Sequence, residues 1–150
     1  MRLSRLTALC SVIALTMACH ESTTPLTIGS GVYRLESING RPVPAFVSAE
    51  PADTTFILSA TLTLDGAGNA TRVEHWRYVY QPNRTDEGTL TLHVEYRITG
   101  NDITVGSFTP CGPAAICEGN KIGKLSSTTL TLAYDSPTAP VFLYRIEPSL

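Results

Sequence analysis

The residues best suited to chemistry in this sequence are two histidines with carboxylate neighbours. His75 directly follows Glu74, and His93 lies two residues before Glu95 in a stretch where polar and apolar residues alternate. Side chains two apart on a β-strand point to the same side, so His93 and Glu95 could ligate a metal ion, with His75 as a third ligand. Such neighbours are also common on the solvated face of a strand. We therefore expect no metal site.

Other enzyme motifs are missing. No serine lies in a nucleophile elbow, no glycine-rich phosphate loop precedes a helical segment, and no pair of carboxylates stands out. The 11 basic and 13 acidic residues form no basic stripe, which argues against nucleic-acid binding. The sequence thus predicts a protein that is not an enzyme, needs no cofactor and binds no nucleic acid.

The N-terminus has the pattern of an export signal. Residues 1–5 carry two arginines, residues 6–17 are mostly apolar but too few to span a bilayer, and Ala18 is small, as a cleavage site requires. Ordinary cleavage after Ala18 would release a secreted protein with a free thiol at Cys19. With such a signal we expect the mature chain to lie outside the cytoplasm.

The end of this segment, Leu-Thr-Met-Ala-Cys, resembles the lipobox of bacterial lipoprotein precursors, although Thr16 stands where that family more often has leucine. The resemblance implies that residues 1–18 are removed and that a lipid on Cys19 anchors the protein in the cell envelope. Residues 19–30 are polar and lack periodicity, so we expect a tether that holds a domain at residues 31–150 off the membrane surface.

The other two cysteines that remain in the mature chain are Cys111 and Cys117. An oxidising compartment favours their pairing, and Gly112 and Pro113 between them can turn the chain back. So small a ring would contribute roughly 2 kcal/mol in the chain-entropy description. Their spacing fits neither paired zinc ligands nor a redox CxxC motif, so we expect a structural disulfide.

Alternation of apolar and polar residues predicts an all-β fold. Residues 55–64 and 89–99 alternate most regularly, and an Asn-Gly pair at 39–40 closes the first strand with a turn. Turn residues every 8 to 15 positions are typical of an up-and-down barrel or a sandwich. The eight expected strands cover residues 31–38, 55–64, 70–80, 89–99, 103–108, 119–125, 128–134 and 140–147.

This strand pattern, with Gly31, Tyr33 and Arg145, resembles small bacterial lipocalin-like proteins of the calycin group. In that group an aromatic residue two positions after the first-strand glycine, usually tryptophan, packs beneath an arginine of the last strand. The resemblance implies an eight-stranded antiparallel barrel in which Arg145 stacks on Tyr33 and joins the two terminal strands. The first strand also resembles META-type domains, whose later Gly-Cys-Asn motif is missing here.

The barrel interior leaves two alternatives open. An eight-stranded barrel can be filled by its own side chains or can hold one small ligand. Trp76 and Tyr78 lie on a strand with no cleanly apolar face, which suits either an edge or the entrance to a cavity. The inward residues that could line such a cavity are Phe56, Leu58, Leu62, Leu90, Leu92, Tyr96, Leu130 and Leu132.

We therefore expect a non-catalytic lipocalin-like barrel, tethered outside the cytoplasm, that binds a small apolar ligand or serves as a cell-envelope accessory. The alternative is a protein-binding module such as a secreted protease inhibitor. That alternative predicts a filled interior and an exposed apolar segment, at residues 43–47 or in the loop between the two cysteines.

Overall fold

The computed structural model describes residues 29–50, 53–80, 84–108 and 119–148. The predicted signal peptide, Cys19 and the Cys111–Cys117 disulfide lie outside these ranges. Gly29, in the predicted tether, is already buried, and the first strand begins at Ser30. The described strands are β1 (Ser30–Ile38), β2 (Arg41–Pro42), β3 (Ala45–Glu50), β4 (Asp53–Asp65), β5 (Asn69–Tyr80), β6 (Arg84–Thr99), β7 (Asp102–Gly106), β8 (Lys121–Leu125), β9 (Thr129–Tyr134) and β10 (Val141–Ile146).

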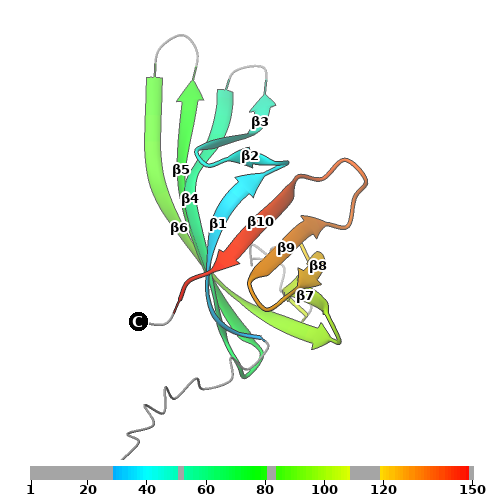
Figure 1. Ribbon diagram of the computed structural model, residues 1–150. Helices are drawn as coiled ribbons and strands as arrows, with labels where there is room; N and C mark the ends of the chain where they lie inside the picture. Colours follow the sequence, from blue (N-terminus) through cyan, green and yellow to red (C-terminus); the bar gives the residue numbers. More distant parts are fainter. Residues whose placement is uncertain (1–28, 51–52, 81–83, 109–118, 149–150) are drawn as a thin grey trace, which may run out of the picture.

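Strand β1 closes the ring because it pairs with β4 along one part of its length and with β10 along another. Residues 30–34 pair with β4, and residues 33–38 pair with β10. The antiparallel ring runs β1-β10-β9-β8-β7-β6-β5-β4 and returns to β1. The fold is thus the predicted closed, eight-stranded antiparallel β-barrel, an arrangement consistent with a lipocalin-like fold (Figure 1).

Two short strands lie outside the ring. Strand β2 extends β1 through the predicted Asn-Gly turn, in which Asn39 and Gly40 both have positive φ angles, 51° and 74°. The Asn39 side chain also accepts a hydrogen bond of 2.8 Å from the amide of Val141 and so ties the turn to β10. Strand β3 pairs with residues 53–57 of β4, the part of β4 that extends beyond its pairing with β1. The sequence pattern did not predict β3.

A β-bulge in β4 divides its inward face into two halves. The pairing with β5 shifts between Ile57 and Ser59, so the extra residue is Leu58. Beyond the bulge Leu62 is buried as predicted, but before it the buried residue is Ile57. The prediction that Phe56 and Leu58 line the interior is therefore wrong. Both are only half-buried, and no perfect alternation can hold across a bulge.

Phe56 packs on the short strand β3 instead of on the barrel core. Its ring meets Phe46 edge-to-face, with centroids 6.2 Å apart and planes at 76°. Such a pair contributes about 0.5–1.5 kcal/mol beyond its buried area. The contact explains why β3 stays attached to a strand that extends beyond the ring.

The predicted stacking of Arg145 on Tyr33 is also wrong. Tyr33 pairs with Ile146 and is 2 % exposed inside the barrel, whereas Arg145 lies opposite Arg34 on the outer face. Adjacent residues of a strand point to opposite faces, so the two side chains cannot meet. Closure is made by the backbone pairing of β1.

Arg145 instead pairs with a carboxylate on the outside of the barrel. Its guanidinium donates hydrogen bonds of 2.5 and 3.1 Å to the two carboxylate oxygens of Glu36 on β1. These bonds hold the pKa of Glu36 below its ordinary value of 4.5 and raise that of Arg145. Inside the barrel, burial and the nearby Tyr96 raise the pKa of the Tyr33 hydroxyl.

Most of the interior is filled by side chains. Leu62 and Leu130 are fully buried, and the Tyr96 hydroxyl donates a hydrogen bond of 2.6 Å to the carbonyl of Gly29. The buried apolar residues that form this core are Tyr33, Leu35, Ile38, Ala45, Ile57, Ala60, Leu62, Leu64, Ala70, Tyr96, Ile103, Val105, Leu125, Leu130, Leu132, Phe142 and Tyr144.

We expect Leu62→Ala to lower the free energy of unfolding by about 2–5 kcal/mol, because it leaves a void in a closed core. Leu58→Ala, on the same strand at the bulge, should cost less than half as much, because its side chain is only half-buried. Urea denaturation of the two variants measures both losses. Equal losses would contradict the assignment of Leu58 to the bulge.

Candidate functional site

The described residues line a cavity of about 190 Å³ at one end of the barrel. At this end strands β3 to β6 extend beyond the ends of β8 to β10, so one side of the barrel rim is higher than the other (Figure 1). The cavity draws its walls from β3, β4, β5, β6, β8, β9 and β10 and from the loop that holds Pro140. It is therefore continuous with the barrel interior.

Strand β5 supplies one wall because its alternate residues all face inward. Arg72, Glu74, Trp76 and Tyr78 line the cavity in that order from the interior toward the rim. The Trp76 and Tyr78 rings have centroids 4.3 Å apart and planes at 58°. Tyr80 continues the row at 6.1 Å from Tyr78. The row makes a continuous aromatic surface from the cavity to the tip of the hairpin.

The opposite wall combines two aromatic rings with a lysine. The Lys121 side chain is 3 % exposed, and its ammonium lies 4.3 Å from the ring centroid of Tyr134 and 5.9 Å from that of Phe142. A cation over the face of a ring is attracted by the ring quadrupole, more strongly when water is excluded. The aliphatic part of the lining comes from Ile57 on β4 and Leu90 on β6.

The floor of the cavity holds a buried ion pair. Arg72 Nε lies 3.0 Å from Glu74 Oε1, with side chains that are 7 % and 14 % exposed. The two atoms are close enough for an ion pair, but the Nε–H group is not aligned to donate a hydrogen bond. Opposite charges must be paired when they are taken out of water, so the two residues depend on each other.

The structure places the residues predicted to line a ligand site in three different environments. Trp76 and Tyr78, predicted at the entrance, are in the cavity wall, and so is Leu90, although it is 41 % exposed. Leu62, Tyr96, Leu130 and Leu132 belong to the filled core. Phe56, Leu58 and Leu92 are half-buried and are not among the described lining residues.

Sequence reasoning missed the charged residues and the opposite wall. Arg72 and Glu74 were visible as charges at alternate positions of a strand with no cleanly apolar face. That pattern is also typical of an exposed edge, so it did not identify them as buried. Lys121 gave no signal, because its burial depends on rings from β9 and β10.

The histidines are not brought together. The Nδ1 atom of His75 lies 2.9 Å from the Thr89 hydroxyl, and that of His93 lies 3.2 Å from the Thr71 hydroxyl. In the β5–β6 register the two histidines are four residue pairs apart, roughly 13 Å along the strands. Among the described residues no cluster of three metal-ligating side chains exists.

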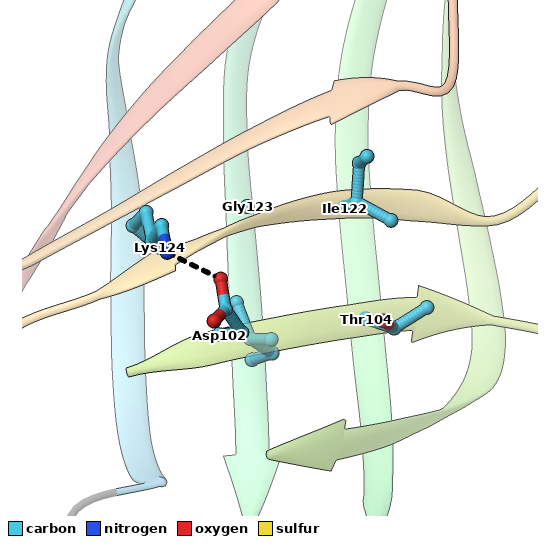
Figure 2. Close-up of a pocket in the computed structure, with 6 residues that line it drawn as sticks. Asp102, Thr104, Ile122, Gly123 and Lys124 are labelled. Carbon is cyan, nitrogen blue, oxygen red and sulfur yellow. Dashed lines mark ion pairs between the residues drawn. The ribbon is translucent and has the colours of Figure 1, made fainter. Parts of the chain in front are cut away.

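A larger hollow, of about 390 Å³, lies on the outside of the barrel (Figure 2). Among the described residues its lining comes from the neighbouring strands β7 and β8, and its polar edge is the exposed ion pair between Lys124 and Asp102, 2.5 Å long. Ile122 in this hollow is 47 % exposed. The described lining of the interior cavity comes from seven strands on both sides of the barrel, so we assign the site to this smaller cavity.

Comparison of the chain with protein families, with characterised proteins and with solved structures finds no match. Within the described part of the chain no helix is long and apolar enough to cross a membrane. The chemistry of the cavity therefore has to be judged from its own residues.

We expect Glu74→Met to destabilise the protein by about 3 kcal/mol, because it leaves the buried Arg72 without this carboxylate. The double variant Arg72→Met/Glu74→Met should recover most of that loss, since both members of the buried ion pair are then replaced by apolar side chains. Urea denaturation of both variants and of Arg72→Met measures the coupling. Additive losses would show that the two side chains do not interact.

Proposed function

We propose that the domain is a non-catalytic, lipocalin-like binding barrel that holds a small, mostly apolar ligand in the cavity at its open end. The observation that carries the proposal is the position of this cavity. It lies between a filled core and the rim, and aromatic and aliphatic side chains from both sides of the barrel line it. Concave, mostly apolar sites with a few polar groups are the usual form of a small-molecule site, and the mouths of β-barrels are a common place for them.

The volume limits the size of the ligand. Pockets for drug-sized molecules usually measure about 300–1,000 Å³. A cavity of about 190 Å³ suits a smaller molecule, and it is too small for a sterol or a haem. Its charged groups are Arg72 and Glu74 at the floor and Lys121 in the opposite wall, and they could fix the orientation of a bound molecule.

The proposal includes a place of action. The export signal and the lipobox-like end at Cys19 support a protein tethered to a membrane outside the cytoplasm, in the bacterial cell envelope. A tethered barrel would hold its ligand close to the membrane surface. It could do so as a carrier or as an accessory to another envelope component.

The protein-binding alternative receives less support from the described residues. Of the segment 43–47 only Pro44 and Phe46 are exposed, while Ala45 is buried and Val43 and Val47 pack against the core. Strand β3 also carries a bulge, which blunts a sheet edge against pairing with another chain. We therefore place ligand binding first.

Fluorescence titration with a series of linear alcohols tests the proposal, because Trp76 is the only tryptophan in the chain and lies in the cavity wall. From 1-butanol upward, each added methylene should strengthen binding about fourfold until the cavity is full. The gain should then stop. An emission spectrum that none of the alcohols changes in a saturable way would contradict a ligand site here.

A matched pair of variants controls this titration. Thr55 lines the cavity, whereas Thr63, near the other end of the same strand, where β4 pairs with β1, is exposed. We expect Thr55→Phe to abolish alcohol binding by filling the space and Thr63→Phe to leave it unchanged. Equal affinities in the two variants would place the binding site elsewhere.

The tether has a separate test. Mass spectrometry of the mature protein, purified from the membrane fraction of a bacterial host, should find Cys19 at the N-terminus with a lipid on its sulfur. Cys19→Ala should move the protein out of the membrane fraction. An unmodified Cys19 would contradict the lipid anchor and leave the ligand proposal standing.

A further inference from the structure

Gly88 lies directly across the β5–β6 pair from Trp76, and its missing side chain makes room for the indole. A Cβ atom built on Gly88 would lie 2.5 Å from Cζ2, 2.9 Å from Cη2 and 3.0 Å from Cε2 of Trp76. These distances are below van der Waals contact, so no other residue fits here unless the ring moves. The backbone of Gly88 has an ordinary φ angle, so its only special feature is the ring above it.

The same distances give the orientation of the ring. The built Cβ position is within half an ångström of equidistant from three consecutive ring atoms. A point over the face of a ring has this property, whereas a point beyond the ring edge would be much closer to one atom than to its two neighbours. One face of the indole therefore rests on the backbone of β6. Trp76 also lines the cavity. The indole face turned away from β6 is the one that a ligand in the cavity could reach.

The Trp76 ring has a second neighbour besides Gly88. Tyr78 packs against it at a centroid distance of 4.3 Å and a tilt of 58°, and this contact restricts movement of the indole. A rigid, flat, electron-rich face at the wall of a small cavity favours a flat ring over a flexible chain, because aromatic rings prefer stacked or edge-to-face contact. The volume of about 190 Å³ has room for one such ring, since a cavity of about 150 Å³ can hold benzene.

We infer that the ligand carries a single aromatic ring that stacks on the face of Trp76 turned away from β6, and that Gly88 is the positioning residue that sets the orientation of the indole. The inference rests on the proposed function, since it names the class of ligand that the cavity takes. Gly88 itself does not need to touch the ligand. Its role is to let the indole lie flat against β6 and so leave the cavity open.

The test uses two small molecules of similar size, each with one hydroxyl group and one methyl group on a six-membered ring. 4-Methylphenol is flat and aromatic, whereas 4-methylcyclohexanol is a puckered saturated ring. Isothermal titration calorimetry of the full mature chain should give a dissociation constant roughly two- to tenfold lower for 4-methylphenol, the size of one aromatic contact. Saturation-transfer NMR should place the aromatic protons of the ligand against the protein.

Two glycine variants separate the role of Gly88 from a general effect of added bulk. In Gly88→Ala the new methyl group pushes the indole into the cavity, so the affinity for 4-methylphenol should fall at least fivefold. Gly119→Ala is the matched control, because a Cβ there meets Tyr134 only at 3.8 Å, an ordinary contact. We expect its affinity for 4-methylphenol to equal that of the native chain.

Variants of Trp76 keep the test decisive if Gly88→Ala does not fold. Trp76→Phe retains a flat ring and should keep the preference for 4-methylphenol, whereas Trp76→Leu should bind both compounds equally. If neither compound binds the native chain, the proposed function itself is wrong. If both bind the native chain equally well, or if Trp76→Leu keeps the preference, ligand binding stands and the stacking inference is overturned.

Discussion

The double pairing of β1 is the constraint on which the rest of the structure depends. Its first residues pair with β4 and its later residues with β10, and the two sets overlap at Tyr33 and Arg34. A bulge between Leu35 and Ser37 bends the strand from one partner toward the other. Without this strand the barrel would have two open edges and a wet interior, and open edges invite pairing with other chains. The core, the cavity and the position of β5 all follow from the closure.

The cavity is a consequence of unequal strand lengths. Strands β4, β5 and β6 have 13, 12 and 16 residues, whereas β9 and β10 have 6 each. Where all strands are present, leucine and tyrosine side chains meet and fill the interior. Where only the long strands continue, their inward residues have fewer partners across the barrel, and the space between Trp76 and Phe142 stays open. The ion pair of Arg72 and Glu74 lies at the boundary between these two regions, where water begins to be excluded.

The alternation of residues was enough to predict the barrel and much of its core, because strand periodicity and burial depend on local sequence. Leu62 and Leu130 are inside for this reason, and the Asn39 turn is a local property as well. The bulge at Leu58 was not predictable, since it depends on the register with β5. The prediction that Arg145 stacks on Tyr33 failed for a related reason, because the register between β10 and β1 decides which face of the barrel Arg145 occupies. In the site, the aromatic row that begins at Trp76 could be predicted from the sequence of one strand. The opposite wall and the contact between Trp76 and Gly88 could not, because they depend on which strands pair.

The closure also sets the order in which the chain can fold. The β5–β6 hairpin joins residues that are near in sequence, so it can form early, but β1 and β10 lie at opposite ends of the domain. Bringing distant segments together is slow because the entropy of the intervening loop is lost before the contacts form. We therefore expect the hairpin to form before β1 and β10 pair, which leaves its aromatic row exposed during folding. Removal of the C-terminal strand would keep the barrel from closing and would leave this aromatic surface exposed. Exposed apolar surface promotes aggregation.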